Sequence, residues 1–156
     1  MGLDFPESIE LDGHGRRIVI AVGRFNGSVT EQLLQGAQTA LLQENVGSAD
    51  ITTFYVAGAF EIPLVLAKAL ATGAYDGGIA LGAVIRGGTP HFEYVCEAVT
   101  SGCLRVSLDA GKPVAFGVLT CDDQQQAAAR VIDGPSNKGR EAAQALLESL
   151  ATLDQL

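Results

Sequence analysis

The residues of this chain best suited to chemistry form one stretch, residues 82–95, with the sequence GAVIRGGTPHFEYV. It continues an apolar run over 80–85, whose small and β-branched residues predict a strand buried on both faces. Gly87 and Gly88 follow, and they allow the backbone to bend and to come close to a bound group. A buried parallel strand that ends in such a turn is a typical ligand position.

The same stretch then begins a helix. Thr89 is a suitable N-cap, and Pro90 fits the first helical position, where its missing N–H loses no hydrogen bond. The free amides and the positive dipole at a helix start favour a bound anion. His91 lies in this first turn, where we expect a neutral imidazole that can accept a proton. A histidine at a helix start is also often structural, so this spacing alone leaves both roles open.

Two nucleotide-binding alternatives are contradicted by particular residues. Gly82 and Gly87 have the spacing of a P-loop, but Gly88 stands where that motif needs lysine, so nucleotide hydrolysis is not expected. A nucleotide-binding module of the flavodoxin-like type would need a phosphate loop after its first strand. The turn over 24–27, RFNG, lacks the several hydroxyl or glycine amides on which such loops rely.

The surrounding sequence predicts the elements that hold this stretch in place. Strands are expected at 17–23, 51–57, 77–85 and 114–120. Helices are expected at about 28–45, 63–72, 90–106 and 142–150, with a short one from Asp122 or Asp123 to near Arg130. Ser28 and Glu31 are expected to form a capping box.

This alternation of strands and helices predicts a single α/β domain over 1–156. We expect a three-layer α/β/α arrangement around a four-stranded parallel sheet with right-handed crossovers. Residues 1–16 are expected to form an irregular arm, or a strand that extends a sheet from or to a neighbouring subunit.

Ligands of such sheets bind beyond the carboxyl ends of the strands, where three loops of this chain converge. Phe25 in the first loop can stack on a flat ring or serve only as a hydrophobic lid. Glu61 in the second can accept hydrogen bonds from hydroxyls or merely suit a helix start. The third loop is 86–91. Arg130 and Lys138, taken alone, are typical of solvated surface charges.

Composition narrows the classes of function. The chain has 156 residues with 10 Lys and Arg against 18 Asp and Glu, a net charge of −8. An acidic chain without a basic run is not expected to bind nucleic acid or an anionic membrane. No secretory leader or membrane-spanning run is present in the sequence, so a cytoplasmic protein is expected.

Charged residues make up only 18 % of the chain, below the roughly 25 % of ordinary domains, and hydrophobic residues make up 47 %. Such a chain is expected to cover apolar surface in a homo-oligomer. The three cysteines show no metal-ligand pattern, so no metal is expected. Cys96 and Cys103 would lie about 10 Å apart on one helix, too far for a disulfide, and reduced thiols are expected.

Five segments occur in an order and spacing that resemble a known family. They are RFN at 24–26, GAFEIP at 58–63, the stretch at 82–95, FGVLT at 116–120 and NKG at 137–139. Together they are similar to 6,7-dimethyl-8-ribityllumazine synthases, the penultimate enzymes of riboflavin biosynthesis. The resemblance covers nearly the whole chain from Arg17 onward.

The resemblance implies a flavodoxin-like α/β/α fold and a transferase reaction. Enzymes of this family condense 5-amino-6-(D-ribitylamino)uracil with 3,4-dihydroxy-2-butanone 4-phosphate, and they release the lumazine, phosphate and water. No metal or organic cofactor is implied. Hand-over of the product to riboflavin synthase is the implied contact with another enzyme.

The resemblance also implies roles for individual residues. Phe25 corresponds to the aromatic residue that stacks on the pyrimidine, and His91 to the proton-transfer residue. The remaining substrate contacts implied within one subunit are Ala59, Phe60 and Glu61 for the ribityl chain and ring, Ala83, Val84 and Ile85 for the pyrimidine edge, and Gly88 and Thr89 for the phosphate.

A neighbouring subunit is implied to complete each site with Phe116, Arg130 and Lys138, where Arg130 pairs with the phosphate. The smallest working unit would then be a pentamer. Family members that build icosahedral shells tend to carry a Gly-x-Lys-x-Gly-Asn loop before the last helix. Residues 132–138, IDGPSNK, lack this lysine and the second glycine, so a free pentamer or decamer is expected. An alternative is a paralogue that binds flavin or lumazine with little or no turnover, as a storage or scaffold protein.

Overall fold

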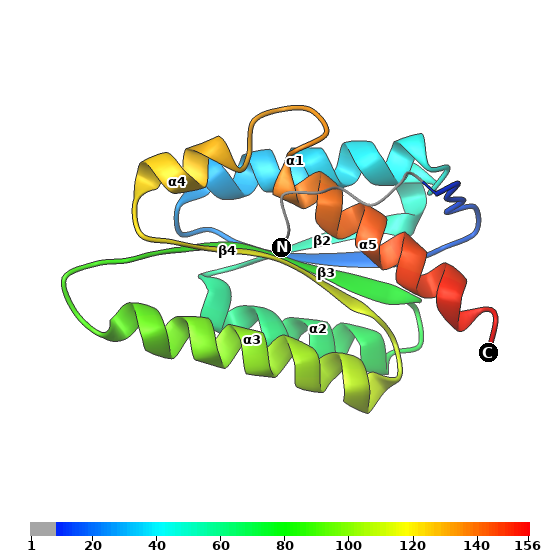
Figure 1. The fold of residues 1–156 in the computed structure, drawn as a ribbon. Coiled ribbons are helices and arrows are strands. Elements are labelled where there is room, and N and C mark those ends of the chain that lie inside the picture. The colour runs from blue at the N-terminus through cyan, green and yellow to red at the C-terminus, as the bar shows by residue number, and fades with distance from the viewer. Residues whose placement is uncertain (1–8) are drawn as a thin grey trace.

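The computed structural model describes residues 9–156 and has the expected α/β architecture (Figure 1). Its sheet is built of four strands in the order β2-β1-β3-β4, and all of the neighbouring pairs are parallel. The strands are β1 (Ile18–Gly23), β2 (Ile51–Val56), β3 (Gly77–Ile85) and β4 (Val114–Cys121). The four expected strands are therefore confirmed to within a residue at each end.

Helices cover both faces of the sheet and make three layers (Figure 1). One face carries α1 (Gly27–Gln43), α4 (Gln124–Ala129) and α5 (Lys138–Leu153). The other carries α2 (Ile62–Ala71) and α3 (His91–Ala110). Two short 3₁₀ turns, Ser48–Asp50 and Ala59–Glu61, precede β2 and α2. No helix within residues 9–156 combines the length and hydropathy that crossing a membrane requires.

Two apolar cores result from the alternation of side chains along the central strands. In β1, Ile18, Ile20 and Val22 pack toward α1 and α5, whereas Val19 and Ala21 pack toward α2 and α3. All six residues of β1 are buried, as expected for an inner parallel strand covered on both faces.

The first helix starts differently from the sequence expectation. The capping box expected of Ser28 and Glu31 was wrong, because α1 already begins at Gly27 and no described side chain caps it. Asn26 precedes it in the left-handed conformation, with φ 60° and ψ 46°. Its carbonyl accepts the first helical hydrogen bonds from the amides of residues 29 and 30, at 2.9 and 3.1 Å. The Asn26 side chain does not cap the helix and is available for another contact.

The helix after β3 begins one residue later than expected. Pro90 lies at the N-cap with φ −65° and ψ 0°, and His91 is the first helical residue. The amide of Glu93 donates to the Pro90 carbonyl at 3.1 Å, a tight turn of the 3₁₀ type that shifts the start of α3. Thr89 therefore precedes the cap, and its Oγ1 accepts only a long hydrogen bond, at 3.4 Å, from the amide of His91.

Other local expectations are confirmed. Asp123 caps α4 by accepting a hydrogen bond from the amide of Gln126 at 2.8 Å. The three cysteines are free, and burial raises the pKa of the Cys103 thiol to about 11. The expected strand in the N-terminal arm falls largely on residues 1–8, which lie outside the described residues, and 9–16 contain no strand.

The start of α5 is fixed against α1 by a buried asparagine. Asn137 caps α5, where its Oδ1 accepts from the amides of Gly139 and Arg140 at 2.9 and 3.1 Å. Its Nδ2 donates to the carbonyls of Gln32, on α1, and Val131, at 3.2 and 2.9 Å. The position of Lys138, the first residue of α5, therefore depends on this contact between the two helices.

Gly139 allows that close approach, and its replacement should be costly. A Cβ at this position would collide with the carbonyl of Leu33 in α1. We expect Gly139→Ala to lower the free energy of unfolding by about 3 kcal/mol, because backbone of α1 must move away. Chemical denaturation at a fixed subunit concentration measures this. Gly27→Ala is the control, since a Cβ there meets nothing within 4 Å. A loss no larger than that of Gly27→Ala would show that the two helices separate easily.

Candidate active site

A hollow of about 610 Å³ opens at the carboxyl ends of the strands. Its walls come from the turn after β1, the 3₁₀ turn after β2, the end of β3 and the first turns of α3. The residues that line it are Phe25, Asn26, Gly58, Ala59, Phe60, Glu61, Ala83, Val84, Ile85, His91 and Val95. Eight of the residues expected from the sequence thus line one hollow.

Two aromatic rings stand exposed at this hollow. The side chains of Phe25 and Phe60 are 69 % and 62 % exposed, although both are large and apolar. Phe25 packs against the backbone of Gly58, where a Cβ would lie 2.7 Å from the ring. Glycine at position 58 is therefore needed for the ring to take this place. Exposed rings held by backbone in this way are suited to stack on a flat ligand.

Backbone hydrogen bonds join the two turns that carry these rings. The amide of Arg24 donates to the carbonyl of Val56 at 2.9 Å, and the amide of Phe25 donates to Ala57 at 3.0 Å. Glu61 stabilises the turn after β2, because its Oε2 accepts a hydrogen bond from the amide of Gly58 at 3.0 Å. Glu61 is exposed, and its Oε1 makes no hydrogen bond with the other described residues, so it remains available to a hydroxyl.

The end of β3 presents unpaired backbone to the hollow. β3 pairs with β1 only as far as Leu81, opposite Val22, whereas its pairing with β4 continues to Ile85. Residues 82–85 are therefore paired with a neighbouring strand on one side only. On the open side, Nδ2 of Asn26 donates to the carbonyl of Ala83 at 2.9 Å.

Asn26 lines the hollow, although no role was expected for it beyond its place in the RFN motif. The sequence contained a signal for this turn, because asparagine is the residue, after glycine, that most readily takes the left-handed conformation. Gly58 and Val95 also line the hollow without having been expected. Val95 follows His91 by one helical turn, a spacing that places both side chains on one face.

The loop between β3 and α3 provides hydrogen-bond donors. Residues 86–90 are all exposed, and the amides of residues 87–89 donate no hydrogen bond to any other residue within 9–156. They lie just before the N-terminus of α3, where an anion is favoured. Gly88 and Thr89 do not line the hollow itself, but His91, two residues further on, does.

Three expected residues lie apart from the hollow in the single chain. Phe116 is on β4 with its ring 43 % exposed. Arg130 follows α4 and donates from its NH1 to the carbonyl of Gln126 at 2.8 Å. Lys138 donates to both carboxylate oxygens of Glu141 at 2.8 and 2.9 Å. From the resemblance, all three were expected to act in the site of a neighbouring copy.

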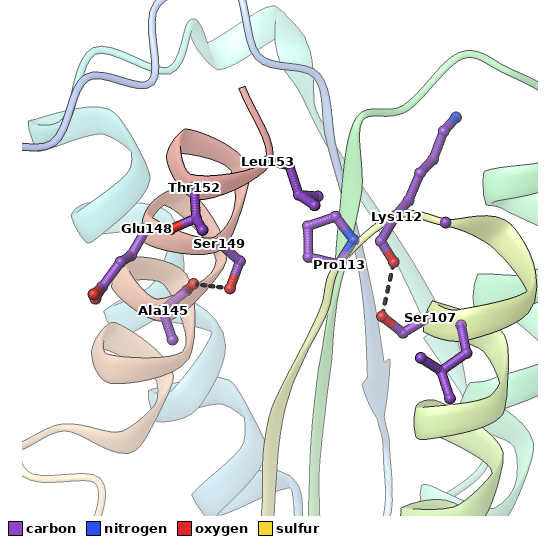
Figure 2. Close-up of a pocket in the computed structure, with 10 residues that line it drawn as sticks. Ser107, Lys112, Pro113, Ala145, Glu148, Ser149, Thr152 and Leu153 are labelled. Atoms are coloured by element: carbon purple, nitrogen blue, oxygen red, sulfur yellow. Dashed lines mark hydrogen bonds between the residues drawn. The ribbon is translucent and has the colours of Figure 1, made fainter. Parts of the chain in front are cut away.

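A second hollow, of about 580 Å³, lies at the opposite end of the sheet (Figure 2). It lies where α3 and α5 end and β4 begins, around Pro113. Two of its three hydroxyls are already occupied, since Ser107 donates to the Lys112 carbonyl and Ser149 to the Ala145 carbonyl, both at 2.8 Å (Figure 2). Ligands of parallel sheets bind at the carboxyl ends of the strands, so the first hollow is the better candidate.

The first hollow combines the parts that a reaction on a flat, hydroxylated ligand needs. It has exposed rings for stacking, unpaired strand backbone for a polar ring edge, a carboxylate for hydroxyls and an imidazole for proton transfer. No three or more His, Cys, Asp or Glu side chains within residues 9–156 are grouped to hold a metal ion.

Comparison with known proteins identifies the family of the chain. Residues 15–154 match the model of a family described as 6,7-dimethyl-8-ribityllumazine synthase. A protein of that name from Lactiplantibacillus plantarum is 52 % identical over 141 residues, which cover 90 % of this chain and 89 % of that protein. Another, from Anaeromyxobacter dehalogenans, is 51 % identical over 143 residues, which cover 92 % and 88 %. The family match covers most of the chain, including every element around the hollow, and the chain belongs to the 6,7-dimethyl-8-ribityllumazine synthase family.

Proposed function

We propose that this chain condenses 5-amino-6-(D-ribitylamino)uracil with 3,4-dihydroxy-2-butanone 4-phosphate to 6,7-dimethyl-8-ribityllumazine, releasing phosphate and water. The reaction is a group transfer in riboflavin biosynthesis. The observation that carries the proposal is the convergence of Phe25, Glu61, the open end of β3 and His91 on one hollow, in a chain of this family.

The pyrimidine is proposed to bind between Phe25 and the end of β3. On the open side of residues 83–85 the Ala83 carbonyl is bonded to Asn26, and the remaining amides and carbonyl can pair with the N–H and C=O groups of a uracil edge. The Phe25 ring supplies the stacking surface. The ribityl chain is proposed to run along Ala59, Phe60 and Glu61, where the carboxylate can accept hydrogen bonds from its hydroxyls.

The phosphate of the second substrate is proposed to bind at the amides of Gly88 and Thr89. Arg130 of a neighbouring copy would pair with it, because a guanidinium forms two parallel hydrogen bonds with a phosphate. Phe116 and Lys138 of the same neighbour would close the site. The free backbone donors at 87–89 support this assignment.

His91 is proposed to move protons during the condensation. The 5-amino group forms an imine with the ketone and releases one water. Elimination of phosphate then leaves an enol, which tautomerises to a second ketone. The ribitylamino nitrogen attacks this ketone and closes the ring with loss of a second water. Each step transfers protons between nitrogen, carbon and oxygen, which a histidine in the hollow can assist. Holding both substrates face to face would supply much of the remaining acceleration.

Sites shared between copies require an oligomer, for which we propose a pentamer or a decamer. Large apolar side chains on the face formed by α2 and α3 support burial against another copy, since Leu64, Tyr94, Leu104 and Leu108 are all exposed in one chain. Light scattering would give the assembled mass.

The proposed reaction is tested by mixing purified protein with the two substrates and following the fluorescence of the lumazine. We expect lumazine and phosphate to form in equal amounts. Binding of lumazine or riboflavin at one per subunit, without turnover, would instead indicate the non-catalytic paralogue.

His91→Ala is expected to lower kcat by about 10- to 100-fold and to leave measurable turnover, because approximation of the substrates does not depend on the imidazole. Steady-state kinetics on the assembled variant measure this. His14→Ala is the matched control, since His14 is exposed in the N-terminal arm, away from the hollow. Complete loss of turnover with intact assembly would contradict the role given to proximity.

Arg130→Ala is expected to raise the KM of the phosphate substrate by about 10- to 100-fold, the effect of losing a charged hydrogen-bond pair. The KM of the uracil substrate should stay nearly unchanged, because its proposed contacts come from other residues. Arg105→Ala, which removes an exposed arginine paired with Asp109 on α3, is the control. Equal changes in both KM values would exclude a specific role at the phosphate.

A further inference from the structure

The loop that carries the proposed phosphate site has little to hold it in place. Residues 86–90 are exposed, and a Cβ at Gly87 or Gly88 would meet no atom within 4 Å. Neither side-chain packing nor hydrogen bonds from the amides of residues 87–89 to other described residues fix the middle of the loop. Its geometry must therefore be set from its two ends.

The side chain of Arg86 connects these two ends. Its Nε donates to Oδ1 of Asp122, in the β4–α4 turn, at 2.8 Å. Its NH1 donates to Oε1 of Glu93, in the first turn of α3. The guanidinium also lies 4.3 Å from the centre of the Phe92 ring, a cation–π contact. The contact with Glu93 spans the two glycines, and the contact with Asp122 attaches the loop to the neighbouring strand turn.

The arrangement makes use of the shape of arginine. A guanidinium presents its donors in a rigid plane, so it can bind two carboxylates in different directions while one face covers a ring. The backbone of the same residue is fixed as well, because the Arg86 amide donates to the carbonyl of Cys121 at 2.9 Å. Hydrogen bonds from Arg86 lower the pKa of both Glu93 and Asp122, so both partners are ionised at neutral pH.

We propose that Arg86 is a positioning residue for the condensation: it holds the loop at both ends so that the amides at Gly88 and Thr89 meet the phosphate while His91 faces the hollow. Arg86 is assigned no contact with substrate, because its Nε and NH1 bind two carboxylates and its face covers the Phe92 ring. This inference rests on the proposed function.

The test compares Arg86→Met with Arg105→Met. We expect Arg86→Met to raise the KM of the phosphate substrate by at least about tenfold and to lower kcat, because a misplaced reactant reacts more slowly. The KM of the uracil substrate should stay within about twofold, since its proposed site is not on this loop. Arg105→Met should change neither, because Arg105 lies on α3, beyond the loop, and its ion pair is with Asp109.

Glu93→Gln separates positioning from charge. This variant removes a negative charge close to the phosphate, so an effect of charge alone would lower the KM of the phosphate substrate. Loss of positioning would raise it. We expect an increase that is smaller than in Arg86→Met, and we expect the double variant to resemble Arg86→Met alone, because both changes break the same connection.

Binding of inorganic phosphate, measured by calorimetry, reports on the loop without requiring turnover. We expect Arg86→Met to weaken phosphate binding by about tenfold, while assembled mass and melting temperature remain those of the unaltered protein.

A phosphate affinity unchanged in Arg86→Met, or a KM of the phosphate substrate lowered in Glu93→Gln, would overturn the inference. Loss of assembly in Arg86→Met together with equal rises in both KM values would also overturn it, by showing a purely structural role. Absence of turnover in the unaltered protein would instead refute the proposed function, and the phosphate measurement would still decide the role of Arg86.

Discussion

The site depends on one feature of the sheet, which is that β3 continues beyond the end of β1. Buried backbone donors and acceptors need partners, and a strand that outlasts its neighbour leaves one of its sides unpaired. Here pairing with β1 ends at Leu81, while β4 supports the other side of β3 as far as Ile85. The Asn26 side chain donates a hydrogen bond to one of the unpaired carbonyls, that of Ala83, at 2.9 Å. The remaining groups face a hollow bounded by aromatic rings, which suits a ligand with a planar, hydrogen-bonding edge.

The same early end of β1 explains the conformation of the turn that follows it. A left-handed Asn26 starts α1 immediately and directs its amide toward β3, so the chain cannot also provide a side-chain cap for that helix. The turn is held by amides that donate to the end of β2, and Phe25 packs on Gly58. An unusual backbone angle, an uncapped helix and an exposed ring therefore have a single cause, the use of this turn as a wall of the hollow.

The sequence predicted the strands well, because buried parallel strands are continuous apolar runs whose limits are marked by glycine, proline and charged residues. It predicted the helix starts less well. Ser28 and Glu31 fit the pattern of a capping box, but that pattern cannot reveal that Asn26 has a partner on a strand 57 residues away. Arg86 and Asp122 are likewise 36 residues apart, and the contact between Arg140 and Gln43 spans 97. Contacts of this kind depend on the folded topology, whereas apolar periodicity is a local property.

The distribution of charge also bears on how an acidic chain can attract an anionic substrate. Two cations to which the proposal gives a role already have carboxylate partners within residues 9–156. Arg86 is paired to Glu93 and Asp122, and Lys138 is paired to Glu141. Arg130 differs, because its NH1 donates to a neutral carbonyl and the described residues offer it no ion pair. A guanidinium without a counter-ion loses no existing ion pair when it binds a phosphate, whereas the paired cations would have to exchange one carboxylate contact for another. Of Arg86, Lys138 and Arg130, only Arg130 is therefore without an ion pair among the described residues. This supports the proposal that Arg130 binds the phosphate of a substrate held by a neighbouring copy.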